Sequence, residues 1–257
     1  MMRNQERGRL ARMRAGRPRS LLATPLFWIG LFFAALLLRM EVLRPLLQWA
    51  FPDVEPVIYS RDSFFALFVA QLGVVAAASL GASLVGVALA IFVTRRAGHD
   101  FRAMVNALAT VGQTFPPAAV LAITVPMVGF GARPTVIALF LYGLLPIIEN
   151  AVAGLEGVPS GVREAAEGMG LSARQRLWQV EMPLAAPVIL AGIRISVTIA
   201  IGTATIGSTV GALTLGTPIF DGLVTNKLPF VVEGAVLVAL FAILTDMLFA
   251  RLERRLR

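Results

Sequence analysis

Residues Phe64–Val93 read FFALFVAQLGVVAAASLGASLVGVALAIFV, a stretch of 30 residues that contains no Asp, Glu, Lys or Arg. A run of about 20 apolar residues is long enough for a helix to cross the hydrocarbon core of a bilayer. This stretch is longer than one perpendicular helix needs, and a tilt absorbs the excess. Gly73, Gly81 and Gly86 allow close packing or a bend. The stretch therefore predicts a transmembrane helix.

Further apolar windows lie on both sides of this one. The chain has 257 residues, of which 57% are hydrophobic and 15% charged, and its mean hydropathy is +0.79. Soluble domains carry about a quarter charged residues. We therefore predict an all-α fold, a polytopic helical membrane protein without room for a further soluble domain of useful size. Its other expected spans are Leu21–Leu38, Ala107–Val128, Thr135–Ala153, Val188–Val210 and Val231–Ala250.

The basic residues indicate the orientation of these spans. Of the 23 Lys and Arg, 17 fall within residues 3–19, 94–102 and 154–187 or after Ala250. Because cytoplasmic loops collect Lys and Arg, we expect both termini and the 154–187 loop in the cytoplasm. The net charge of +8 is then explained by membrane orientation, not by nucleic acid. The first apolar window lacks a small-x-small cleavage site after it, so we expect it to be retained.

The third window is interrupted by Gln113-Thr114-Phe115-Pro116-Pro117. Two consecutive prolines remove two amide donors and prevent an unbroken helix. Inside a bilayer, the freed carbonyls need protein or water as partners. Two interpretations stay open: a broken helix beside a translocation path, which Gln113, Thr114, Pro116 and Pro117 would line, or a packed kink.

The fifth window carries two stripes of residues at helical spacing. Small residues let helix backbones approach closely in a bilayer. We expect one stripe to pack on a helix and the other to face a central passage or a subunit contact. Alternatively, the threonines only donate to carbonyls of their own helix. The small stripe is Gly192, Ser196, Ala200, Ala204 and Ser208, and the second stripe is Arg194, Thr198, Thr205 and Thr209.

Ionisable residues inside membrane spans are costly and often functional. Besides Arg194, the candidates are Glu149 and Asp246 near expected cytoplasmic helix ends and Glu233 near an outer end, where snorkelling or capping also explains them. The only histidine, His99, lies in a basic loop, and the chain has no cysteine. We find no glycine-lysine phosphate loop and no His-Glu-x-x-His pattern. We therefore expect neither catalysis nor a bound metal or cofactor on this chain.

A polar segment separates the fourth and fifth windows. Ser160 is a plausible helix N-cap, and Gly168 and Gly170 permit a turn after a short helix. Ser172 can cap a second helix over Ala173–Glu181, after which Pro183 is expected to interrupt the chain before the fifth span. Such a protruding helical surface can bind a groove in another protein.

The motif Glu164-Ala165-Ala166, followed by Gly170 and by Val180-Glu181-Met182-Pro183, resembles the coupling segment of bacterial ABC-importer permeases. The longer block REAAEGMGLSARQRLWQVEMPLAAPVILAGIRIS at 163–196 resembles permeases of the glycine-betaine and choline osmoprotectant type. The blocks VGQTFPPAAVLAI at 111–123, GFGARPTVIALFLYGLLPI at 129–147 and IGTATIGSTVGALTLGTPI at 201–219 extend this resemblance to roughly residues 60–250. Met182 departs from the usual Leu, a volume-conserving change.

The resemblance implies a type I ABC-importer transmembrane domain with about six spans in a bacterial inner membrane. Its implied partners are cytoplasmic ABC ATPase subunits that bind ATP and Mg, a second permease chain (itself or a paralogue), a periplasmic solute-binding protein and membrane lipid. The ATPase-coupling residues it implies are Glu164, Ala165, Ala166, Gly168, Gly170 and Pro183.

The expected organisation and function follow from this resemblance. Residues 1–20 form a basic cytoplasmic tail, 21–63 the first transmembrane helix and a periplasmic loop, 64–250 the permease core with its coupling segment at 160–183, and 251–257 a second basic tail. The expected function is ATP-driven import of an osmoprotectant such as glycine betaine or choline by alternating access. The alternatives are a permease for another solute (an amino acid, methionine or a sulfonate), an ion-coupled secondary transporter, a membrane-embedded enzyme or a passive scaffold.

Overall fold

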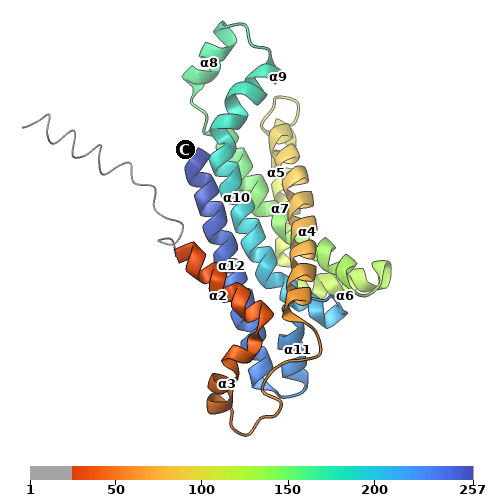
Figure 1. Ribbon diagram of the computed structural model, residues 1–257. Helices are drawn as coiled ribbons and strands as arrows, with labels where there is room; N and C mark the ends of the chain where they lie inside the picture. Colours follow the sequence, from red (N-terminus) through yellow and green to blue (C-terminus); the bar gives the residue numbers. More distant parts are fainter. Residues whose placement is uncertain (1–24, 257) are drawn as a thin grey trace, which may run out of the picture.

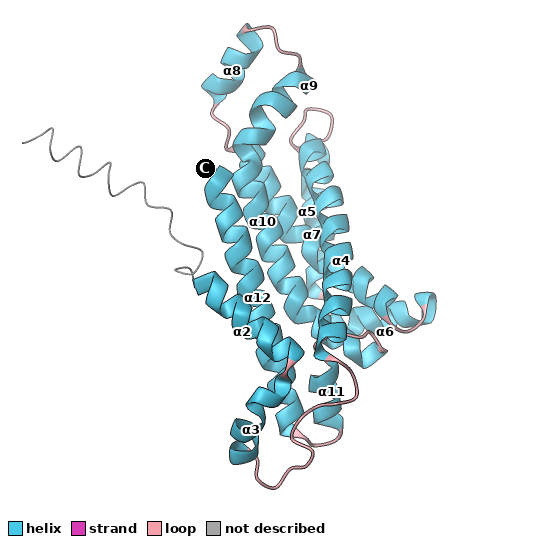
Figure 2. Cartoon of the chain, viewed as in Figure 1, coloured by secondary structure: helices cyan, strands magenta, loops and turns pink. Residues whose placement is uncertain are grey.

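The computed structural model describes residues 25–256, and in that part of the chain every regular element is a helix (Figure 2). Four helices are long and apolar enough to cross a membrane. They are α4 (Phe64–Val93), α7 (Ala132–Glu156), the continuous helix Ala173–Val210 that contains α10 (Met182–Thr203), and α12 (Leu228–Leu256). The predicted all-α membrane fold is thus confirmed.

Two further spans are bent pairs of helices. The first joins α2 (Pro25–Leu38) to Met40–Ala50 at an angle of 101°, and the second joins His99–Thr114 to α6 (Pro117–Val128) at 94°. Counting each pair as one span gives the six that the sequence predicts. The basic tail at 1–20 and the start of the first apolar window lie outside the described residues.

The remaining elements are short. Most of them are parts of the spans given above, and the others lie at the two ends of the bundle (Figure 1). They are the 3-10 turns η2 (Met40–Leu43), η3 (His99–Phe101) and η5 (Ala204–Val210), the π turn η4 (Leu177–Glu181), and the α-helices α3 (Arg44–Ala50), α5 (Arg102–Thr114), α8 (Ser160–Gly168), α9 (Ala173–Arg176) and α11 (Thr217–Val224).

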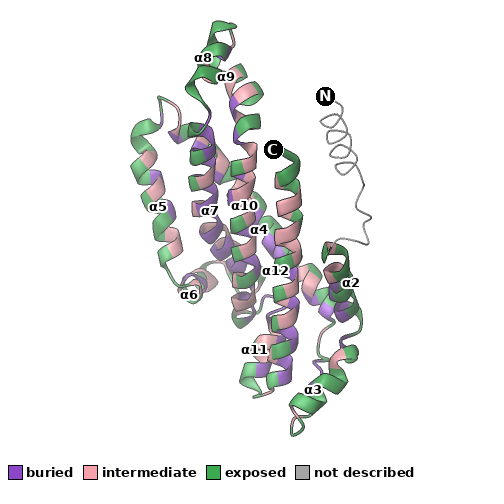
Figure 3. Ribbon diagram, turned by 90° about the vertical axis from the view of Figure 1, so that its left-hand side faces the viewer, coloured by how far each residue is buried: buried purple, intermediate pink, exposed green. Residues whose placement is uncertain are grey.

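Helix α7 occupies the middle of the bundle, where it packs against α4, α10, α5 and α6. Helix α10 also packs against α12, and α2 flanks α12 on the outside (Figures 1 and 3). Helices α8 and α9 protrude at the end where the described chain finishes, and α11 lies at the opposite end (Figure 1). We refer to these as the α8 end and the α11 end.

Small residues bring α4, α7 and α10 into close contact. A Cβ added at Gly143 of α7 would lie 2.5 Å from Ser196 Oγ, and one at Gly192 of α10 would lie 2.7 Å from the Pro146 carbonyl oxygen. Because there is no space for a side chain at either glycine, the backbones of α7 and α10 lie close together, as small residues permit in a bilayer. All five members of the small stripe, Gly192, Ser196, Ala200, Ala204 and Ser208, are buried. The expectation that one stripe packs on a helix is correct.

Two buried polar side chains fasten the α11 end. Gln71 of α4 donates to the Ile201 carbonyl over 3.0 Å and accepts from the Leu215 backbone N–H over 2.8 Å. Glu233 of α12 is fully buried and accepts from the Tyr59 N–H over 3.0 Å. Burial, followed by the hydrogen bond to Asp62, raises the pKa of Tyr59 above its ordinary value. The 51–63 loop is therefore fixed to the last span.

The contact at Gly192 predicts a stability difference between two glycine substitutions in α10. Gly192→Ala should lower the melting temperature of the purified protein, because its methyl group overpacks the contact with Pro146 and Asn150 at a cost of about 1–3 kcal/mol. For a chain of this size, each kcal/mol corresponds to about 2–4 °C. Gly202→Ala is the matched control, since nothing lies within 4 Å of its added Cβ. Equal melting temperatures for the two variants would contradict the packing argument.

Candidate functional site at the α8 end

Helix α8 protrudes beyond the bundle and carries most of the predicted coupling residues (Figure 1). Glu164, Ala165 and Gly168 are exposed, whereas Ala166 is buried. Met169, directly after the helix, is 72% exposed. Exposed apolar surface beside a carboxylate suits contact with another protein better than contact with water. The predicted alanine pair therefore divides, with one member facing outward and the other packed inward.

The turn after α8 requires a glycine. The Gly170 N–H donates to Glu167 O and the Leu171 N–H to Ala166 O, which closes the helix end. Gly170 has φ +81°, a left-handed conformation that a residue with a Cβ adopts only at a cost. Of the two predicted joint glycines, Gly170 is thus needed for its backbone conformation, while Gly168 has an ordinary helical conformation with open space around it.

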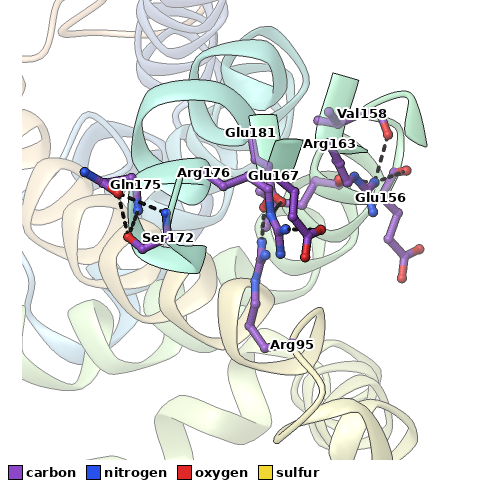
Figure 4. A network of polar contacts seen from close by, with 10 residues as sticks. Arg95, Glu156, Val158, Arg163, Glu167, Ser172, Gln175, Arg176 and Glu181 are labelled. Carbon is purple, nitrogen blue, oxygen red and sulfur yellow. Dashed lines mark hydrogen bonds and ion pairs between the residues drawn. The ribbon is translucent and has the colours of Figure 1, made fainter. Parts of the chain in front are cut away.

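Arg163 anchors α8 to the end of α7. Its Nη2 donates to the carbonyl oxygens of Leu155, Glu156 and Val158 over 3.1, 2.9 and 2.9 Å (Figure 4). The last carbonyls of a helix lack intrahelical donors and carry partial negative charge. The Arg163 guanidinium therefore supplies hydrogen-bond donors to the free carbonyl groups at and just after the end of α7. It also fixes the direction in which the chain enters α8.

Ser172 begins the second short helix, as predicted. Its side chain accepts from the Gln175 N–H, and Gln175 reciprocally accepts from the Ser172 N–H, which forms a capping box. The prediction for Ser160 is wrong, because Pro159 occupies the N-cap position and no side chain caps α8.

The expectation that Pro183 interrupts the chain is also wrong. It lies at the start of α10 inside a continuous 38-residue helix, Ala173–Val210. The preceding turn is a π turn in which the Met182 N–H donates to Leu177 O, five residues back. Because this wider turn shifts the hydrogen-bond register, the proline ring and its missing N–H are accommodated without a break.

Glu181 is the centre of an ion-pair network that joins α8 to the bundle (Figure 4). Its carboxylate is 3% exposed and contacts Arg95, in the loop after α4, at 2.5 Å and Arg176 of α9 at 3.3 Å. Arg176 also contacts Glu167 of α8 at 3.0 Å. A buried carboxylate is tolerated only when paired. Glu181, Arg95 and Arg176 are absent from the predicted site, and an acid within the apolar Val180-Glu181-Met182-Pro183 run is the signal that points to them.

The broken third span fits the packed-kink interpretation at Gln113. Pro146 of α7 has no N–H, so the Tyr142 carbonyl four residues earlier loses its helical donor. Gln113 Nε2 donates to that carbonyl over 2.7 Å. Thr114 is exposed and donates to Thr110 O and Val111 O, Pro116 is exposed, and Pro117 begins α6. These four residues therefore form the junction of α5, α6 and α7.

The second stripe of the fifth span is more accessible than the small stripe. Arg194, Thr198 and Thr205 are half-buried and Thr209 is exposed. Thr198 donates to Arg194 O, Thr205 to Gly202 O and Thr209 to Ile206 O, so the threonines do bond to their own helix. Arg194 forms a bidentate pair with Asp246 of α12 over 2.5 and 2.7 Å. The coupling residues and this stripe form two separate groups, because of the coupling residues only Pro183 belongs to the continuous Ala173–Val210 helix.

A bundle of apolar helices with two short helices protruding at one end is the architecture of a polytopic membrane protein (Figure 1). A family model described as "Binding-protein-dependent transport system inner membrane component" matches residues 82–257. The osmoprotectant import permease protein OsmY of Salmonella typhimurium is 45% identical over 175 residues, which cover 68% of this chain and 74% of the relative. The chain belongs to this family, the permease subunits of ABC importers.

Two further comparisons agree with this assignment. The glycine betaine/carnitine/choline transport system permease protein OpuCB of Bacillus subtilis is 35% identical over 192 residues, 75% of this chain and 83% of the relative. A structure described as inward-facing conformations of the MetNI methionine ABC transporter shares the fold, with a TM-score of 0.67 at 20% identity over 77% of this chain and 100% of that chain. The predicted type I ABC-importer fold is confirmed.

The network around Glu181 predicts how firmly α8 and α9 are held. Glu181→Leu should speed amide hydrogen exchange and proteolysis across residues 157–182, because it leaves Arg95 and Arg176 without their shared carboxylate. Since both arginines are partly exposed, we expect a loss of about 1–3 kcal/mol in local stability, below the cost of breaking a fully buried pair. Glu164→Leu is the matched control, because Glu164 is exposed and should leave exchange unchanged.

Proposed function

We propose that this chain forms the translocation path of an ATP-driven importer for osmoprotectants with an ammonium group, such as glycine betaine, carnitine or choline. The observation that carries the solute class is the sequence similarity to OsmY and OpuCB across more than two thirds of the chain. The relatives' names state an osmoprotectant and glycine betaine, carnitine and choline. We take these solutes as the proposal for this chain.

We further propose that the α8 end is the docking surface for a cytoplasmic ABC ATPase subunit, which would bind ATP and Mg. Arg163 and the Glu181 network hold α8 against the bundle, so a force on its exposed face reaches α7, α9 and α10. The outward surface of Glu164, Ala165, Gly168 and Met169 would seat in the ATPase. The permease itself would then need no catalytic residue or cofactor.

The charge distribution supports a cytoplasmic location for the α8 end and the chain termini. In the described residues the α8 end carries nine Arg and Lys at loops and helix ends, and the α11 end carries five. Lys and Arg accumulate on the cytoplasmic side. The α11 end would then receive solute from a periplasmic binding protein, and a second permease chain, either a copy or a paralogue, would complete the path.

The docking proposal predicts uncoupling by two substitutions. Glu164→Lys, or Gly170→Asp at a left-handed backbone position, should lower solute-stimulated ATPase activity and uptake by about tenfold or more, as expected when an interaction of about 1.4 kcal/mol or more is lost. The importer is measured in nanodiscs with its ATPase and binding protein. Leu84→Ile, a conservative change at an exposed position in the middle of α4, is the control and should behave as wild type. Undiminished coupling in both α8-end variants would refute the docking surface.

The solute proposal predicts a selective response to loaded binding protein. The wild-type complex is assayed for ATPase stimulation and uptake with glycine betaine, carnitine, choline, methionine and taurine. We expect stimulation by the first three solutes only. Stimulation by methionine or taurine alone would assign the chain to another solute class while leaving its place among ABC-importer permeases intact.

A further inference from the structure

The helical segment Met40–Ala50 carries large apolar side chains that no other part of the described chain covers. It comprises η2 and α3, and it turns away from α2 by 101°. Val42, Leu46 and Trp49 are 64%, 58% and 82% exposed, and Trp49 is the most exposed large apolar side chain of the described residues. Their spacings of four and three place them on one side of the helix. We call this side the α3 apolar face.

The rest of the segment divides into a packed face and a polar face. Leu47 is buried and Leu43 partly buried in the hydrophobic core that joins α2, α4 and α12. Glu41, Arg44 and Gln48 are exposed and share the polar face, on which Arg44 donates to Glu41 over 2.6 and 3.0 Å. The packed face lies between the polar face and the α3 apolar face. Helices with one apolar and one polar exposed face characteristically lie in the plane of a membrane interface.

Charged residues mark the end of the first span. Arg39, Glu41 and Arg44 follow directly after α2, and all three are exposed. Inside the hydrocarbon core such side chains would need protein or a water-filled cavity around them. The predicted window Leu21–Leu38 has 18 residues, which is long enough to cross the core without α3. The segment Met40–Ala50 therefore begins at a boundary between hydrocarbon and water.

A hollow connects the surface of α2 with the α3 apolar face. Leu38, which is 72% exposed at the end of α2, and Val42 both line this hollow of about 530 Å³. Arg39, Glu41 and Asp62 line it as well. One surface thus combines exposed apolar side chains with charged groups, as the depth where acyl chains meet headgroups requires. The exposed apolar surface of α2 therefore continues onto the segment that follows it.

We propose that Met40–Ala50 is an interfacial helix, which lies on the bilayer surface with its α3 apolar face among the lipid acyl chains near the headgroups. In Figures 1 and 3, α3 lies at the α11 end of the bundle, so this is the bilayer surface that it contacts. Tryptophan is enriched at this depth, because its ring is apolar and its N–H is polar. The polar face then borders water, and the packed face stays on the bundle.

This contact gives the first span an anchor that the rest of the permease does not supply. Lipid holds the α3 apolar face while Leu47 holds the same segment to the core. The end of α2 and the start of the 51–63 loop are thereby kept at one depth. The segment lies before residues 82–257, which the family model matches. The proposal concerns lipid alone and depends neither on the solute nor on ATPase docking.

Spin labels distinguish the surroundings of the two exposed faces. The chain has no cysteine, so Leu46→Cys on the α3 apolar face and Gln48→Cys on the polar face each accept a single nitroxide. Each full-length chain is labelled and then assembled into the importer in nanodiscs of phosphatidylethanolamine and phosphatidylglycerol. Power saturation measures collisions with oxygen, which concentrates in lipid, and with a water-soluble nickel chelate. We expect the ratio of oxygen to nickel collisions to be several times higher at position 46 than at position 48.

A third label tests the direction of the helix. Val42→Cys lies four residues before position 46, about 6 Å along the helix, and should report the same depth because an interfacial helix is parallel to the surface. A depth difference of that size would mean that the helix enters the bilayer steeply. Equal nickel collisions at positions 46 and 48 would place the apolar face in water, and shielding of position 46 from both reagents would mean that protein covers it. Each of these three results overturns the lipid contact, while the proposed function stands.

Discussion

A backbone carbonyl that loses its helical donor inside a bilayer finds no water to replace it. This constraint determines how the spans of the permease are joined. Pro146 frees the Tyr142 carbonyl of α7, and Gln113 from the neighbouring span supplies the missing donor. Gln71 likewise reaches Ile201 O near the point where α10 tightens into a 3-10 turn. At these two places the irregular backbone is bound by a side chain from another helix, which holds α5 beside α7 and α4 beside α10.

The apolar windows were sufficient to predict the number and order of the spans, and the proline pair was sufficient to predict the break in the third. The ends of the helices were harder to predict from the sequence. Helices such as α12, which runs from Leu228 to Leu256, continue for several residues into polar sequence. The angle of 94° between the two halves of the third span depends on their packing against α7. Hydropathy along one segment carries no information about such a contact.

The residues of the candidate site likewise fall into those that could be predicted from local sequence and those that could not. Ser172 and Gly170 act through their nearest neighbours in sequence, so their roles could be predicted from local patterns. The pairing of Glu181 with Arg95 joins residues 86 positions apart and requires the fold. Pro183 was misjudged because a π turn, which no residue pattern announces, shifts the hydrogen bonds that a proline would otherwise break. Gln113 could be understood only beside Pro146, a residue of another span.

The unbroken Ala173–Val210 helix has a mechanical consequence. Its 38 residues extend for about 57 Å at 1.5 Å per residue, well beyond the roughly 30 Å of bilayer hydrocarbon. A rod of that length conveys torsion as well as thrust, so a small rotation imposed beside α9 sweeps the whole row of side chains on α10 through the same angle. The third span instead bends by 94° between its two halves, and both halves pack against α7. A single rotation of this helix would then open the translocation path at one end of the bundle and close it at the other.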